Sequence, residues 1–199
     1  MDQMKSLLFL LASVSIASNA FAFEILALGT SNTNCKGTDQ AYTKALNEML
    51  EKDGIKATVI NAGKDGDTPQ FMIRRMSGLI NSNTKLVIFE PGPNERNKQQ
   101  NLSDAEKILV DLQKRQLPTI YVSNGAIESE ADASVRAQKY NAIFYGSWAR
   151  GVPTDREHRQ YDQPHIPNSA GHMTEKGCRL WASNIYPLIK QVIAEKQIK

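Results

Sequence analysis

The stretch FEILALGTSNT, residues 23–33, decides the fold class. Its first seven residues form a short apolar run that predicts a buried β-strand, and the run ends at Gly-Thr-Ser. Runs of the same kind follow at residues 56–61 (KATVIN), 85–90 (KLVIFE) and 118–123 (PTIYVS). Each of these runs predicts a further strand.

Segments with helical periodicity separate these strands. Ser103 and Glu106 have the spacing of a capping box, which predicts that one helix begins at Ser103. Strands that alternate with helices predict a three-layer α/β/α sandwich around a central parallel sheet of about five strands. Residues 151–171 lack a strand pattern and predict a long loop. The expected helices span residues 41–52, 70–80, 103–116, 131–148 and 174–197.

The N-terminus carries the pattern of a secretory signal peptide. Lys5 precedes an apolar run over residues 7–16, and Ala20-Phe21-Ala22 matches the A-x-A cleavage pattern. The run is too short to span a bilayer as a helix, and no later segment is apolar enough to do so. We therefore expect a signal peptide over residues 1–22 and a single domain over residues 23–199, periplasmic or secreted. The alternative is a buried first helix.

Charge excludes some classes of partner. The 199 residues include 24 Lys+Arg and 21 Asp+Glu, for a net charge of +3. This charge is too small to predict a nucleic acid or an anionic membrane surface as a partner, and the basic residues form no stripe. The three histidines lack a zinc-like spacing, so we expect no metal. No organic cofactor is implied.

Polar, glycine-rich segments follow three of the predicted strands. They are GTSNT at 29–33, NAGKDGDT at 61–68 and PGPNER at 91–96. A fourth segment, HMTEKG at 172–177, leads into the last predicted helix. The carboxyl ends of parallel strands meet at one edge of the sheet, where function collects. A serine there can act as a nucleophile, an asparagine can donate to an oxyanion, and a histidine is the usual base. Taken singly, each segment is a weak signal, and an ordinary turn or loop explains it better.

In this order and placement, the segments resemble the sequence blocks of the SGNH (GDSL-type) hydrolases. GTSNT is similar to the block G-D-S-x-S/T, NAGKDGDT to the glycine block, PGPNER to G-x-N-D, and HMTEKGCRLWA to the segment that carries the family's histidine. The resemblance covers residues 23–199 and implies a flavodoxin-like α/β/α fold. It also implies Ser31 as the nucleophile, and the backbone of Ser31, the backbone of Gly66 and the side chain of Asn94 as the oxyanion hole.

Two histidines are candidates for the family's fourth block, D-x-x-H. The literal match is Asp162 with His165, but the family's histidine lies five residues before a glycine that opens the last helix. His172 and Gly177 satisfy that spacing, although position 169, where the acid would then stand, is a serine. We favour His172 as the base, with Asp162 as its acid or with no acid. The pair Asp162 and His165 is the alternative.

The resemblance implies a serine hydrolase that cleaves carboxylic ester or thioester bonds through an acyl-enzyme on Ser31. Its substrate would be a small-molecule, glycan or lipid ester. Two alternatives stay open at this point. One is a carbohydrate O-acetylesterase of the same family, and the other is a non-catalytic binding protein that retains the fold.

The chain has two cysteines, Cys35 and Cys178. Cys35 lies four residues after Ser31, and Cys178 lies six residues after His172. The two cysteines therefore start close to each other if Ser31 and His172 meet in one site. A disulfide between them is one hypothesis, and two free thiols are the other.

Overall fold

A computed structural model of the chain describes residues 22–166 and 168–198. The predicted signal peptide lies outside this part, except for Ala22. The strands are β1 (Phe23–Gly29), β2 (Ala57–Gly63), β3 (Thr84–Phe89), β4 (Thr119–Ser123) and β5 (Ile143–Ser147). They form one parallel sheet in the order β2-β1-β3-β4-β5.

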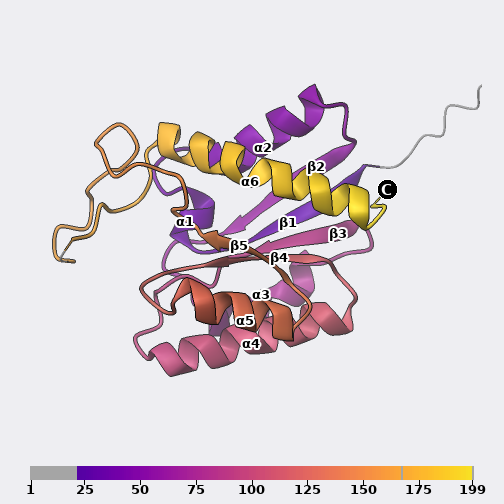
Figure 1. Cartoon of the computed structure of the whole chain (residues 1–199), viewed down its shortest axis with the longest axis horizontal. Helices are drawn as coiled ribbons and strands as arrows, with labels where there is room; N and C mark the ends of the chain where they lie inside the picture. The colour runs from indigo at the N-terminus through magenta and orange to yellow at the C-terminus, as the bar shows by residue number, and fades with distance from the viewer. Residues whose placement is uncertain (1–21, 167, 199) are drawn as a thin grey trace, which may run out of the picture.

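Helices cover both faces of the sheet. They are α1 (Ser31–Asn34), α2 (Ala41–Lys52), α3 (Pro69–Leu79), α4 (Lys98–Lys114), α5 (Glu130–Lys139) and α6 (Glu175–Glu195). Figure 1 shows α2 and α6 above the sheet and α3, α4 and α5 below it. The predicted three-layer α/β/α sandwich with a parallel sheet is therefore confirmed. In the described part of the chain, no helix has both the length and the apolar character needed to cross a bilayer.

Strand β1 shows why its sequence is apolar after Glu24. Ile25 and Ala27 belong to the core cluster that includes α2 and α6, whereas Leu26 and Leu28 belong to the cluster that includes α3, α4 and α5. Successive side chains of a strand point to opposite faces, and each face of this sheet is covered by helices. The apolar run from Ile25 to Leu28 is the consequence.

Helix α4 begins earlier than the sequence indicated. Its N-cap is Asn97, whose side chain accepts a hydrogen bond from the backbone N–H of Gln100, and its first residue is Lys98. Ser103 is an exposed residue inside the helix. The predicted start at Ser103 was wrong because Asn97, six residues earlier, provides the capping oxygen.

The predicted helix over residues 131–148 was wrong in its second half. Helix α5 ends at Lys139, and Asn141 adopts a left-handed conformation with φ 55°. The chain then enters β5, which pairs with β4 from Ile120 and Ile143 onward. Pairing with β4 is a long-range contact, so it overrides the helical periodicity of the local sequence.

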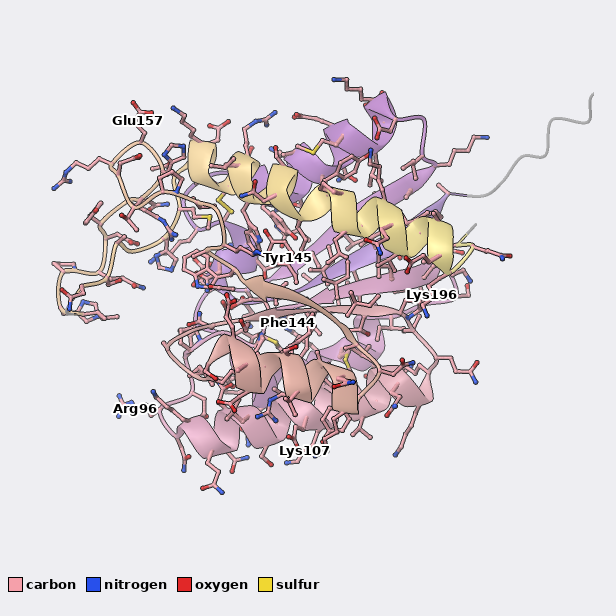
Figure 2. The ribbon with its side chains drawn as sticks, in the orientation of Figure 1. Arg96, Lys107, Phe144, Tyr145, Glu157 and Lys196 are labelled. Carbon is pink, nitrogen blue, oxygen red and sulfur yellow. A yellow bond between two sulfur atoms is a disulfide. The ribbon has the colours of Figure 1, made fainter. Side chains whose placement is uncertain are left out.

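A disulfide joins Cys35, the C-cap of α1, to Cys178 in the first turn of α6, with Cα atoms 6.2 Å apart (Figure 2). Both residues are buried in the core cluster under α2 and α6. The bond ties the turn after the first strand to the start of the last helix.

Replacing both Cys35 and Cys178 with alanine is expected to lower the free energy of unfolding by about 2–4 kcal/mol. The reason is that the bond closes a loop with a sequence separation of 143 in the unfolded chain. Urea denaturation of the two proteins measures the difference, and a reductant should move the wild-type midpoint to that of the variant. Equal midpoints for the oxidised wild type and the variant would contradict the prediction.

Candidate active site

Ser31, His172 and Asp162 form a hydrogen-bonded row. Ser31 is the first residue of α1, directly after β1, whereas Asp162 and His172 lie in the long loop between β5 and α6. The Oγ atom of Ser31 is 2.9 Å from Nε2 of His172, and Nδ1 of His172 is 2.6 Å from Oδ2 of Asp162. The backbone N–H of His172 also donates to Oδ1 of Asp162 over 2.9 Å.

The two contacts with Asp162 orient the imidazole of His172. With Nδ1–H donating to the carboxylate, Nε2 is left with a lone pair that can accept the proton of Ser31. Ser31 is 9 % exposed and His172 is 7 % exposed, so both are largely shielded from bulk water. The row can therefore act as a nucleophile with a general base and an orienting acid.

A hairpin brings Asp162 back to His172. The backbone N–H groups of Gln160 and Tyr161 donate to the carbonyls of His172 and Ala170, over 2.8 and 3.0 Å. Gly171 is required here because its φ is +72° and because a Cβ atom at this position would lie 2.4 Å from Oδ1 of Asp162. The loop thus places the acid ten residues before the histidine.

The other candidates of this loop have different places. His165 is exposed, and in the described ranges no hydrogen bond joins it to Ser31 or Asp162. Ser169, which stands where the acid was sought, accepts a hydrogen bond from the backbone N–H of Gly171. The structure therefore brings His172 and Asp162 together with Ser31, and His165 is not part of this hydrogen-bonded row.

The pKa of Asp162 is below its ordinary value. Burial acts to raise this pKa, but the backbone and side-chain hydrogen bonds from His172, together with the attraction of its ring, outweigh that effect. Asp162 consequently stays a carboxylate through the neutral and mildly acidic range.

Buried Glu90, the residue after β3, holds the turn that carries Ser31. Glu90 is 1 % exposed. It accepts hydrogen bonds from the backbone N–H and hydroxyl of Thr30, over 3.0 and 2.7 Å, from Nδ2 of Asn32 over 3.1 Å, and from the hydroxyl of Thr33 over 3.3 Å. The residues on both sides of Ser31 are thereby tied to the end of a neighbouring strand.

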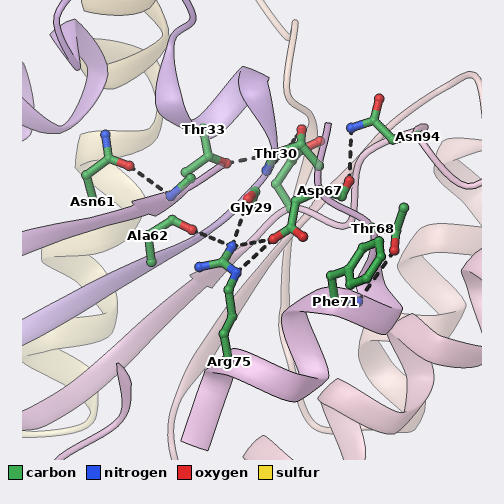
Figure 3. A network of polar contacts seen from close by, with 12 residues as sticks. Gly29, Thr30, Thr33, Asn61, Ala62, Asp67, Thr68, Phe71, Arg75 and Asn94 are labelled. Atoms are coloured by element: carbon green, nitrogen blue, oxygen red, sulfur yellow. Dashed lines mark hydrogen bonds and ion pairs between the residues drawn. The ribbon is translucent and has the colours of Figure 1, made fainter. Parts of the chain in front are cut away.

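Asn94 is held by a second network, at the ends of β1 and β2 (Figure 3). Its Nδ2 donates to the carbonyl of Asp67 over 2.9 Å. The buried carboxylate of Asp67 pairs with Arg75, whose Nη2 also donates to the carbonyls of Gly29 and Ala62. The second proton of the Asn94 amide stays available for another acceptor.

A pocket of about 590 Å³ opens over the row. Ser31, His172 and Asn94 line it, and Gly66 does not. Gly66 has a left-handed φ of 72° in the turn before Asp67, and its part in an oxyanion hole stays a prediction.

Sequence reasoning did not find several residues of the site and its pocket. Glu90 carries one signal, since it is a charged residue that ends an apolar run. The others come from the ends of β4 and β5 and from the loop, and no local pattern marks them; they are Asn124, Trp148 and Arg159. Within residues 22–166 and 168–198, no three His, Cys, Asp or Glu side chains are grouped so that they could hold a metal ion.

No protein-family model matches the chain, and no curated protein matches it by sequence. Solved structures do match it by shape. The psychrotrophic esterase EstA from Pseudoalteromonas sp. superposes with a TM-score of 0.70 at 16 % identity, over 86 % of this chain and 98 % of that one. For AlinE4, an SGNH-hydrolase family esterase, the TM-score is 0.58 at 24 % identity, over 86 % and 97 %.

The chain has the SGNH hydrolase fold. TesA has a TM-score of 0.70 at 17 % identity, over 85 % of this chain and 99 % of its own. The SGNH fold that the family resemblance implies is therefore confirmed over most of the chain. At these identities the likeness concerns the fold, and the chemistry of the site has to be argued from its geometry.

In the pH dependence of stability, Asp162→Asn is expected to differ from the wild type only above about pH 4, the ordinary pKa range of an aspartate. A lowered folded-state pKa stabilises the fold above the unfolded-state pKa, and this contribution disappears as the pH falls through the folded-state pKa. Urea midpoints of both proteins between pH 7 and pH 2 measure it. A difference that grows toward low pH would contradict the assignment.

Glu90→Gln is expected to lower the free energy of unfolding by about 1–3 kcal/mol, because the amide NH₂ would face hydrogen-bond donors in either orientation. Glu51→Gln, at an exposed position of α2, is the matched control and should change stability by less than about 0.5 kcal/mol. Chemical denaturation compares the three proteins. Equal stability of the two variants would show that the Glu90 network does not hold the turn.

Proposed function

We propose that the protein is a serine hydrolase that cleaves carboxylic ester or thioester bonds through an acyl-enzyme on Ser31. One observation carries the proposal, namely the hydrogen-bonded row of Ser31, His172 and Asp162, of which Ser31 and His172 line a pocket. A serine with a base at 2.9 Å, and a base that is itself oriented by a carboxylate, is the arrangement that activates a hydroxyl for acyl transfer.

The proposed reaction has two halves. Nε2 of His172 takes the proton of Ser31 as Oγ attacks the ester carbonyl, and the same proton then passes to the leaving alcohol or thiol. A water molecule, activated by His172, next attacks the acyl-enzyme, releases the acid and restores Ser31. The carboxylate of Asp162 stabilises the imidazolium in both halves.

Hydrogen-bond donors must stabilise the negative charge of the tetrahedral intermediate. The backbone N–H of Ser31 and the free amide proton of Asn94 are the candidates that the pocket offers, and the backbone N–H of Gly66 is the third that the family resemblance implies. The Asp67–Arg75 pair supports this role, because a donor that is already held by a network loses little freedom when the oxyanion forms.

Two further points support a hydrolase over a non-catalytic protein with the same fold. Position 169 holds a serine where the family resemblance would have an acid, and this is the argument for a binding protein. The hydrogen bond between Asp162 and Nδ1 of His172 supports a hydrolase, because a carboxylate there can orient the imidazole. In addition, the solved structures with this fold include proteins described as esterases, EstA and AlinE4 among them.

Ser31→Ala is expected to lower the rate of p-nitrophenyl acetate hydrolysis by about 10⁴-fold or more, because the attacking oxygen is lost. His165→Ala, which changes an exposed histidine of the same loop, is the matched control and should keep wild-type activity. Initial rates are compared with near-ultraviolet circular dichroism, which reports whether the variants are folded. A folded Ser31→Ala protein with wild-type activity would refute the proposed nucleophile.

A further inference from the structure

A buried arginine lines the same pocket as Ser31 and His172. Arg159 is 5 % exposed, and its guanidinium lies over the ring of Trp148, 4.8 Å from the ring centre. Its Nε donates to the carbonyl of Pro153 over 3.2 Å. A guanidinium has five N–H donors, so most of its hydrogen-bonding capacity remains for another partner.

The charge of Arg159 has no counter-ion in the described part of the chain, where no carboxylate oxygen lies within 4.0 Å of its nitrogens. The half-buried arginines elsewhere in the fold differ, since Arg75 pairs with Asp67 and Arg136 pairs with Glu106 and Glu128. Burial lowers the pKa of Arg159, which means that its surroundings disfavour the charged form. A bound anion would remove that penalty.

Arg159 also lies close to the proposed base. It forms an antiparallel bridge with Met173, the residue after His172, so the two backbones are neighbours in the hairpin. The β3–α4 loop adds Arg96 to the pocket lining and the first residue of α4 adds Lys98, against one acidic residue, Glu95. Figure 2 shows Arg96 at the same end of the molecule as the loop that carries Arg159.

We propose that the pocket binds an anionic group of the substrate, a carboxylate or a phosphate, through Arg159. This inference rests on the proposed ester hydrolysis and names the class of ester. The planar fork of a guanidinium matches the oxygens of either anion, and Trp148 offers a flat apolar surface beside it. The substrate is thus an ester whose acyl or alcohol part carries a negative charge.

A purely structural role for Arg159 makes a different prediction. If the residue only fixes Trp148 and the segment at Pro153, its replacement should change the turnover of charged and neutral esters by the same factor. The selectivity between matched charged and neutral esters separates the two roles.

The experiment uses two matched pairs of substrates. Mono-4-nitrophenyl adipate and its methyl ester place the charge on the acyl side, and 4-acetoxybenzoate and its methyl ester place it on the leaving group. The wild type is expected to prefer the charged member of at least one pair by about tenfold or more in kcat/KM, the size of a charged hydrogen-bond contribution. Arg159→Gln should lower this ratio about tenfold, and Arg159→Lys should lower it less.

Arg115→Gln is the matched control. Arg115 is the C-cap residue of α4 and pairs with Asp111, outside the pocket, so its replacement should leave the ratio unchanged. Equal rates for both members of both pairs in the wild type would overturn the proposal. A preference that survives in Arg159→Gln would also overturn it. If Arg159→Gln does not fold, the charged-to-neutral ratio of kcat/KM in Arg159→Lys is compared with that of the wild type, and an unchanged ratio overturns the proposal.

Calorimetry separates this proposal from the proposed hydrolysis. If the wild type cleaves none of the four esters, the hydrolase assignment fails, and the titration of adipate and of inorganic phosphate then tests the anion site alone. Binding of either anion to the wild type, weakened about tenfold or more in Arg159→Gln, supports the site. The anion that binds more tightly shows whether the site prefers a carboxylate or a phosphate. Binding of neither anion overturns it.

Discussion

The buried carboxylate of Glu90 is the constraint on which the rest of the site depends. It accepts four hydrogen bonds from Thr30, Asn32 and Thr33, so the turn after β1 cannot move without exposing a charge or leaving donors unpaired. A nucleophile needs this rigidity, because a small displacement of Ser31 would break its 2.9 Å contact with His172. The strands themselves are held by apolar packing on both faces of the sheet, which provides the platform for the turn.

The second half of the site comes from the other end of the chain, and two restraints bring it to the first. The disulfide between Cys35 and Cys178 joins the C-cap of α1, four residues after Ser31, to the first turn of α6, six residues after His172. The hairpin before α6 then returns Asp162 to the imidazole. Each restraint reduces the freedom that the loop between β5 and α6 would otherwise have.

Two charged residues near the pocket, Asp162 and Arg159, have different roles in the proposed reaction. Asp162 stays ionised because His172 donates to it twice, and its charge is matched by the imidazolium that forms during the proposed reaction. Arg159, in contrast, is a buried cation with no carboxylate nearby among the described residues. An acidic partner within the chain would neutralise this arginine, and its absence leaves the positive charge facing the space in which a substrate would lie.

The sequence by itself determined the positions of the first four strands along the chain, the sandwich, and the segments that carry Ser31, Asn94 and His172, because apolar runs and turn residues are local signals. It did not place the start of α4 or reveal β5, since one depends on which oxygen caps the helix and the other on pairing with β4. Only the tertiary structure chose Asp162 as the partner of His172 and excluded His165. That choice follows from a hairpin whose hydrogen bonds and Gly171 conformation fold the loop back on itself, and linear spacing does not encode such a contact.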